Sequence, residues 1–186
     1  MKKARKFTPP IKPLTIYYYG DGKGKTSAGL GAALRAAGHN YRCLILQAIK
    51  GDWPSGEQFA IPKYLMKMIT IKAAGKGFVG IMGDKLSIDD HKKAAEKAIN
   101  IAHDEISNGK WDLVVLDEYG DLPNMKLITI NKLIKCIPLK RKKTDVIITG
   151  HKPIKKLINH CDTVTNMKKV KHPFDRGIIA KKGIDF

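Results

Sequence analysis

Short apolar runs alternate with stretches of helical periodicity along this 186-residue chain. The apolar runs lack the two-residue alternation of a half-exposed strand, so each one predicts a buried strand. The predicted strands cover residues 15–19, 42–49, 68–72, 112–116, 145–149 and 163–170. Predicted helices cover residues 26–37, 57–67, 124–136 and 153–160, and a longer one runs from a capping residue at Ser87 to Asn108-Gly109. This order predicts an α/β fold, with a mostly parallel sheet and helices on both faces.

The first residues do not share this pattern. Residues 1–13 hold five basic residues and three prolines but no acid, which predicts a flexible basic N-terminal arm. Residues 14–186 are about the length of one ordinary domain. No run approaches the roughly 18 apolar residues of a membrane helix, and no secretory signal follows the basic start. With only three cysteines and no CxxC pair, the sequence favours a cytoplasmic protein with no membrane association.

The net charge is unusual for a globular chain. Lys and Arg total 35 against 17 acidic residues, which gives a formal charge of +18. A field of this sign attracts polyanions such as nucleic acids, nucleotides or anionic membranes. The alternative is a general preference for surface lysine, because the lysines are spread over the whole chain. Charge alone does not decide between these two interpretations.

The segment between the first predicted strand and its helix reads GDGKGKT, residues 20–26. Glycines let successive backbone N–H groups approach a phosphate and replace its water, and the following helix start adds a positive dipole end. Lys25 can then reach the terminal phosphates, and the Thr26 hydroxyl can bind Mg²⁺. Tyr19 stands where the usual motif has its first glycine. The alternative is a simple turn before a helix, but the order of strand, turn, Gly-Lys-Thr and helix favours phosphate binding.

A second element ends in two acids. Residues 114–118 read VVLDE, so Asp117 and Glu118 come at the carboxyl end of an apolar strand. Carboxylates placed there lie near a phosphate loop and can hold Mg²⁺ directly or through water. Surface acids that cap the next helix are the alternative. Together the two motifs predict a Mg²⁺-nucleotide protein, either an ATPase that acts on nucleic acid or a small-molecule transferase.

Three further segments narrow this choice by resemblance. Residues 47–57 (QAIKGDWPSGE) resemble the Q-F-I-K-G-x-W-x-x-G-E stretch of the ATP:corrinoid adenosyltransferases. Residues 20–26 match that family's own loop, G-[ND]-G-K-G-K-T, which also lacks the usual glycine before it. Residues 171–177 (KHPFDRG) and 183–186 (GIDF) are similar to its closing segments. The resemblance covers about residues 15–186, and the four motifs in order are more specific than any one of them.

This resemblance implies a RecA-like P-loop NTPase fold and transfer of the 5′-deoxyadenosyl group of ATP to Co(I) of a corrinoid. The triphosphate would leave as one unit. By the resemblance, Lys25 and Glu118 are the catalytic residues, and Thr26, Glu118 and Asp117 are the Mg²⁺ contacts. The cofactor-binding set implied in this way comprises Gly20, Asp21, Gly22, Lys23, Gly24, Lys25, Thr26, Ser27 and Phe78.

The corrinoid-facing loop of the family corresponds to residues 74–80. Phe78 would match the aromatic side chain that packs against the lower corrin face and displaces the axial ligand. Gly80 stands where the family has tryptophan, so this second aromatic is missing. Nearby in the closing segment, His172 precedes a proline, which favours a structural hydrogen bond over a catalytic role.

The partners implied by the resemblance are ATP, a corrinoid, an electron-donor reductase and a second copy of the chain. The basic arm would match a family segment that covers the bound corrinoid in a homodimer. No nucleic acid is expected, because the sequence has no RNA-recognition or helix-turn-helix pattern. Two alternatives stay open: a RecA-like ATPase or nucleic-acid-binding P-loop protein, and a regulatory nucleotide-binding protein that has lost its chemistry at Gly80.

Overall fold

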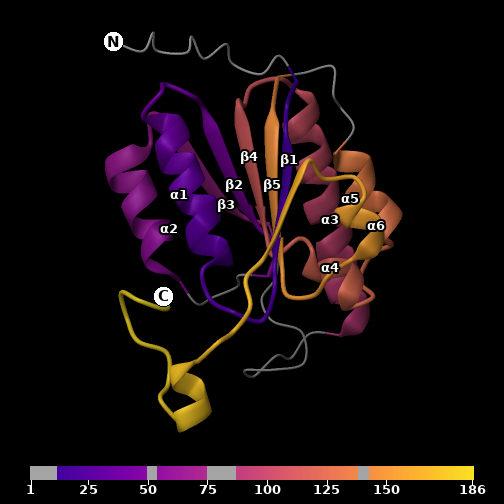
Figure 1. Cartoon of the computed structure of the whole chain (residues 1–186). Coiled ribbons are helices and arrows are strands. Elements are labelled where there is room, and N and C mark those ends of the chain that lie inside the picture. The colour runs from indigo at the N-terminus through magenta and orange to yellow at the C-terminus, as the bar shows by residue number, and fades with distance from the viewer. Residues whose placement is uncertain (1–11, 50–53, 75–86, 138–142) are drawn as a thin grey trace, which may run out of the picture.

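Six strands form one parallel sheet in the computed structural model, which describes residues 12–49, 54–74, 87–137 and 143–186. The strands are β1 (Thr15–Tyr19), β2 (Cys43–Gln47), β3 (Ile69–Ala73), β4 (Leu113–Asp117), β5 (Asp145–Gly150) and β6 (Thr163–Asn166). They lie in the order β3-β2-β4-β5-β1-β6, and each paired neighbour is parallel. All carboxyl ends therefore meet at one edge, the lower edge in Figure 1.

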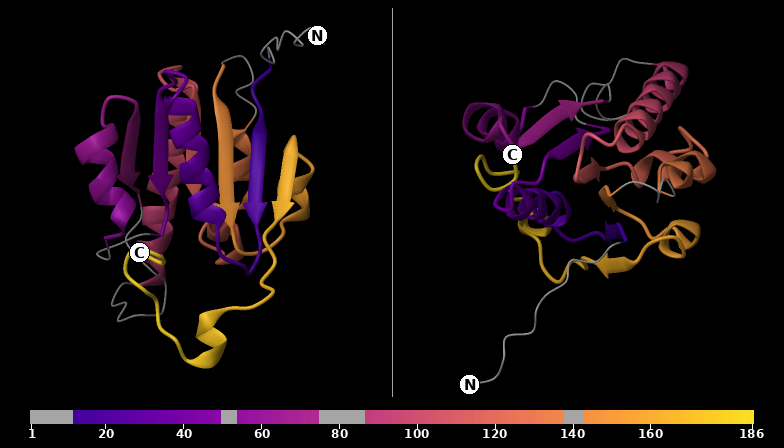
Figure 2. Two further views of the ribbon diagram at one scale, coloured as in Figure 1. Left: turned by 60° about the vertical axis from the view of Figure 1, so that its left-hand side comes forward. Right: turned by 90° about the horizontal axis from the view of Figure 1, so that it is seen from above.

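Helices cover both faces of this sheet, as expected (Figures 1 and 2). The helical elements are α1 (Lys25–Ala37), α2 (Gly56–Ala60), a π-helical turn (Ile61–Leu65), α3 (Ile88–Ser107), α4 (Asp121–Asn124), α5 (Ile130–Cys136), α6 (Lys155–Ile158) and a 3₁₀ turn (Pro173–Arg176). On one face, α1 and the π-helical turn pack on Ile45 and Val115. On the other, α3, α5 and α6 enclose a larger core around Leu44 and Leu116. β2, β4 and β5 are buried on both sides, which explains their apolar runs. The edge strand β6 is exposed along its length, so the buried strand expected there is wrong.

The longest helix begins as its sequence predicts. Ser87 is the N-cap of α3, and its hydroxyl accepts a hydrogen bond from the backbone N–H of Asp90 at 3.1 Å. Small residues then recur at helical spacing on the buried side, among them Ala95, Ala98 and Ala102. These let α3 approach the sheet closely, which leaves polar residues on its outer face. Among the described residues, no helix is long and apolar enough to span a membrane.

Two predicted elements differ from the structure. The single helix expected over residues 124–136 is wrong: α4 ends at Asn124, the backbone of Lys126 adopts a left-handed φ of 57°, and α5 begins at Ile130. The strand expected over residues 163–170 stops at Asn166. It stops there because β1, its partner among the described strands, ends at Tyr19. Residues 1–11, 50–53, 75–86 and 138–142 lie outside the described residues, so the expected N-terminal arm is described only at residues 12 and 13.

Beyond β6 the chain forms a tail, residues 167–186, that runs beneath the carboxyl edge of the sheet. It contains the 3₁₀ turn and comes back toward the start of α1 (Figure 2). His172 caps the 3₁₀ turn, because its Nδ1 accepts a hydrogen bond from the backbone N–H of Phe174 at 3.1 Å. This contact fits the structural role expected of His172. The tail therefore brings late residues of the sequence to the loop that follows β1.

Candidate nucleotide site

The loop between β1 and α1 is shaped by two glycines with positive φ. Gly20 has φ 131° and Gly24 has φ 108°, conformations that residues with a side chain rarely adopt. Gly24 is also the N-cap of α1, so the helix begins at Lys25, one residue before its predicted start. The loop thus leads directly into the first turn of a helix, whose free N–H groups favour an anion.

The first half of this loop packs against the tail. Backbone N–H of Gly22 donates to the carbonyl of Met167 at 2.7 Å, and a Cβ at Gly22 would lie 2.6 Å from that oxygen. The Asp21 carboxylate accepts a hydrogen bond from the backbone N–H of Lys169 at 2.9 Å, which lowers the pKa of Asp21. Gly20 and Gly22 therefore have a second role besides phosphate approach: they make room for the tail backbone.

Lys25 points back into its own loop. Its Nζ donates to the carbonyl of Gly20 at 2.7 Å and to that of Gly22 at 2.8 Å. Partial burial lowers the pKa of the ammonium, while nearby acids oppose this effect. An incoming phosphate would give this half-buried cation the negative partner that two neutral carbonyls do not supply.

Thr26 connects the loop to the end of β4. Its hydroxyl donates to Oδ1 of Asp117 at 2.9 Å, and the hydroxyl of Thr149 donates to the same oxygen at 2.8 Å. The amide of Gln47 approaches Oδ2 at 3.4 Å and Oε1 of Glu57 at 3.3 Å. Asp117 is 1% exposed, so it is a buried acceptor that orients Thr26 rather than an open ligand. Since Thr26 gives its proton to Asp117, its oxygen lone pairs are left for another partner.

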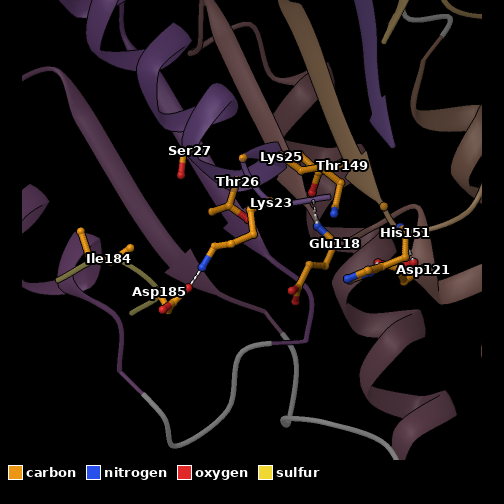
Figure 3. A pocket seen from close by; sticks show the side chains of 12 residues that line it. Lys23, Lys25, Thr26, Ser27, Glu118, Asp121, Thr149, His151, Ile184 and Asp185 are labelled. Atoms are coloured by element: carbon orange, nitrogen blue, oxygen red, sulfur yellow. Dashed lines mark hydrogen bonds and ion pairs between the residues drawn. The ribbon is translucent and has the colours of Figure 1, made fainter. Parts of the chain in front are cut away.

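Glu118 follows in a left-handed conformation, with φ 64°. Such a backbone costs a residue with a side chain roughly 1–2 kcal/mol, and strain of this kind is concentrated at functional sites. The backbone N–H of Glu118 donates to the hydroxyl of Thr149 at 2.8 Å, which supports this turn. The side chain lies in the middle of the pocket, between Lys23 on one side and His151 on the other (Figure 3).

The end of the tail forms one wall of the same pocket. Lys23 forms an ion pair with Oδ1 of Asp185, and Oδ2 of Asp185 accepts from the backbone N–H of Lys181 at 2.7 Å. Ile184 also lines the pocket, and an adjoining cavity of about 440 Å³ reaches Phe186 and Leu30. The closing GIDF segment, singled out in the sequence by resemblance alone, thus lies at the phosphate loop.

The opposite wall comes from two residues with no predicted role, Asp121 and His151. Nδ1 of His151 lies 2.8 Å from Oδ2 of Asp121, and the backbone N–H of His151 donates to Oδ1 at 2.8 Å. His151 comes directly after β5. The rule that ligands bind beyond the carboxyl ends of parallel strands could have pointed to it, had the strand order been known.

The predicted site residues divide into groups. Those that line the pocket are Lys23, Gly24, Lys25, Thr26, Ser27 and Glu118. Gly20, Asp21 and Gly22 contact the tail or the lysine, and Asp117 lies behind Thr26. Phe78 and Gly80 lie outside the described residues. Within the described ranges no group of three or more His, Cys, Asp or Glu side chains forms a ready-made metal site.

A glycine-rich loop after the first strand, a lysine and threonine at the start of the next helix, and two acids at the end of β4 define a P-loop nucleotide-binding α/β protein. A family model described as "ATP:corrinoid adenosyltransferase BtuR/CobO/CobP" matches residues 12–186. The chain belongs to this family, which confirms the resemblance drawn from its motifs.

Several relatives carry the same description. A corrinoid adenosyltransferase of Sinorhizobium sp. is 34% identical over 179 residues, which cover 94% of this chain and 81% of the relative. The corrinoid adenosyltransferase of Escherichia coli K12 is 28% identical over 173 residues, 93% of this chain and 85% of the relative. That of Salmonella typhimurium LT2, named CobA, is 29% identical over 178 residues.

Proposed function

We propose that this protein transfers the 5′-deoxyadenosyl group of ATP to the Co(I) centre of a corrinoid, in adenosylcobalamin biosynthesis or salvage. The observation that carries the proposal is the juxtaposition of Lys25 and Thr26 with Glu118 at one pocket, in a chain that matches the family over residues 12–186. Enzymes that move the γ-phosphoryl group use a similar loop. Here the loop would hold the leaving group instead.

The reaction needs little proton transfer by the side chains. Co(I) supplies an electron pair that forms the Co–C bond at C5′, and the C5′–O bond breaks with its electrons on the triphosphate. No general base is needed for this attack. The protein must align C5′ with cobalt and stabilise the departing anion, and both contributions lower barriers by several kcal/mol. Lys25 and the N–H groups at the start of α1 would stabilise that anion.

The residues present also fit Mg²⁺, which prefers oxygen ligands and phosphate oxygens. Thr26 would supply a hydroxyl oxygen whose proton is already given to Asp117, and Glu118 would supply a carboxylate in the pocket. Bound Mg²⁺ would neutralise charge on the triphosphate as it leaves. Asp117 would act through Thr26, since its oxygens accept hydrogen bonds from Thr26, Thr149 and Gln47.

The proposal includes a setting and partners. Because Co(I) must be produced by reduction, a separate reductase would supply the electrons. We also expect a homodimer, in which the basic arm of residues 1–13 covers the bound corrinoid and Phe78 packs on the corrin face. Cys43, Cys136 and Cys161 are free thiols, which suits a reducing, cytoplasmic compartment.

A direct assay tests the proposal. The protein is incubated with ATP, Mg²⁺ and a chemically reduced corrinoid, and the cobalt–carbon absorption spectrum and the released phosphates are measured. Transfer predicts an adenosylated corrinoid and intact triphosphate. Lys25→Ala should reduce the rate by two to three orders of magnitude, the usual loss when a charge-stabilising group is removed. Lys110→Ala, an exposed lysine before β4, is the matched control and should keep full activity.

Other products would reject the proposal. ADP and phosphate formed in a DNA-stimulated reaction would indicate the RecA-like ATPase instead. Full activity of Lys25→Ala would show that the loop does not hold the triphosphate.

A further inference from the structure

The pocket has a titratable side chain that the proposed chemistry does not yet use, His151. It lies at the carboxyl end of β5, next to β1 in the sheet, and lines the same pocket as Lys25 and Glu118. Its side chain is 59% exposed, whereas that of Asp121 behind it is 8% exposed. An open imidazole is thus held by a nearly buried carboxylate at the phosphate loop.

Asp121 fixes this imidazole twice. One carboxylate oxygen accepts the backbone N–H of His151 and the other lies against Nδ1, each at 2.8 Å. A deprotonated carboxylate only accepts hydrogen bonds, so Nδ1 carries a proton. Nε2 is then the atom that gains or loses the second proton. Because Nδ1 is the ring nitrogen held by Asp121, Nε2 at the far side of the ring is left to meet a ligand.

Charges from several elements act on this ring. The hydrogen bond to Asp121, on α4, raises the pKa of His151 above its ordinary value, and Glu118 after β4 raises it further. Partial burial and Lys25, on α1, act in the opposite direction but do not cancel the increase. The charged form of the ring is therefore favoured at a position where an anion is expected.

The other cations of the pocket already have partners. Lys23 is paired with Asp185, and Lys25 donates to two loop carbonyls. Each ammonium has three N–H donors, so part of its donor capacity is already used by these contacts. His151 differs, because its contacts with Asp121 use Nδ1 and the backbone and leave Nε2 available. Nε2 can therefore meet a ligand while the contacts with Asp121 stay in place.

We propose that His151, held by Asp121, is a triphosphate-binding residue that donates from Nε2 to the leaving group on the side of the pocket opposite Lys23. This inference rests on the proposed function, because it takes the ligand of the loop to be the triphosphate of ATP. It adds a residue after β5 to the residues of the loop itself. The positive charge of His151 would help to neutralise the triphosphate, whose negative charge is larger in magnitude than the combined positive charge of Lys25 and one Mg²⁺.

The test measures binding of inorganic triphosphate with Mg²⁺ by calorimetry, with the full chain. His151→Gln keeps a polar side chain but cannot become charged. At pH 6.5 we expect it to bind triphosphate about tenfold more weakly than the wild type, the size of one charge-assisted hydrogen bond. The ratio of the two affinities cancels the titration of the ligand itself. It should fall toward one as the pH rises to 9.

Two further variants sharpen the measurement. Asp121→Asn removes the charge behind the ring, so the wild-type advantage should be lost at a lower pH. His151→Lys keeps a cation that does not titrate in this range and should restore part of the affinity at pH 9. His39→Gln, an exposed histidine at the end of α1, is the matched control and should bind like the wild type.

The outcomes separate the inference from the proposed function. If folded His151→Gln binds triphosphate like the wild type at pH 6.5 while Lys25→Ala does not bind it, His151 is only structural and the inference is wrong. A pH-independent ratio would also overturn it. If Lys25→Ala and His151→Gln both bind triphosphate like the wild type, the loop is not the triphosphate site and both proposals fail.

Discussion

The hydroxyl of Thr26, in the first turn of α1, donates a hydrogen bond to Oδ1 of Asp117 at the end of β4, 2.9 Å away. This contact joins the two motifs that were recognised separately in the sequence. Asp117 is buried and also accepts a hydrogen bond from Thr149, so this fixed carboxylate sets the orientation of the Thr26 hydroxyl. The geometry presents the threonine oxygen, rather than Asp117, to the pocket.

Replacement of Thr26 should therefore separate metal binding from folding. Thr26→Ser keeps the hydroxyl and should keep most of the transfer activity. Thr26→Val should lower the rate about a hundredfold and raise the Mg²⁺ concentration required, because the proposed Mg²⁺ ligand would be lost. It should also cost about 1–2 kcal/mol of unfolding free energy, since Asp117 loses a donor. Rates over a Mg²⁺ titration and urea unfolding measure the two effects. Equal Mg²⁺ dependence of the valine variant and the wild type would contradict this role.

The close approach of the tail to the loop predicts opposite effects of two glycine substitutions. Gly22→Ala places a Cβ 2.6 Å from the Met167 carbonyl oxygen, and this backbone must move. We expect a loss of about 2 kcal/mol of unfolding free energy, together with weaker ATP binding. Gly31→Ala, in the exposed interior of α1 with nothing within 4 Å of the new Cβ, should instead stabilise by about 0.5–1 kcal/mol. Urea unfolding gives both values, and a neutral Gly22→Ala would show that the tail does not press on the loop.

The Lys23–Asp185 pair predicts a variant with tighter binding. Asp185→Asn removes the negative charge that competes with a phosphate for Lys23. Because the pair is partly exposed, we expect only about a two- to fivefold gain in triphosphate affinity at low salt, and less at high salt. Asp175→Asn breaks a different ion pair of the tail, with Lys169, and serves as the control with unchanged affinity. Weaker binding by Asp185→Asn would mean that this carboxylate helps to hold the ligand.

Glu105 predicts a pH-dependent contribution to stability at the far end of α3. Partial burial opposes its charge, but hydrogen bonds from Lys72, Trp111 and Asn108 prevail and lower the pKa of Glu105 from 4.5 to about 2. A lowered folded-state pKa adds stability that is present above pH 4.5 and lost as the pH falls toward 2. Relative to Glu105→Gln, the wild type should be more stable by about 1 kcal/mol at pH 7, a value reduced by solvent screening. Unfolding at pH 7 and pH 3 measures the change, and Asp104→Asn, on the exposed side of α3, is the control.

Much of this fold could be predicted because β1, β2, β4 and β5 are largely apolar runs. The strand that carries Leu44, Ile45 and Leu46 is buried on both sides, so burial alone dictated its composition. The prediction of one helix over 124–136 was wrong for a local reason. Lys126 takes a left-handed conformation, which hydrophobic periodicity does not reveal. The strand expected over 163–170 is too long for a reason that lies elsewhere in the sequence: its end depends on where its partner β1 stops.

The site was predictable only in part, for a similar reason. Lys25, Thr26 and Glu118 belong to local motifs whose spacing has chemical meaning, and the structure brings them to one pocket. His151 and Asp121 belong to no local motif. They meet because β5 lies between β1 and β4 in the sheet, and this strand order cannot be read from the sequence alone. The role of Asp185 needed the path of the tail, which has no regular pattern between the 3₁₀ turn and its end.

The position of β1 in the sheet has a consequence for how the molecule acquires its shape. This strand is early in the sequence, yet its partners among the described strands are β5 and β6, which come late. Contacts between such distant segments form slowly, because a long chain must be closed before they are gained. We therefore expect that partly folded or nascent chains without β5 and β6 do not bind nucleotide. The protein would then bind its first nucleotide only at the last stage of folding.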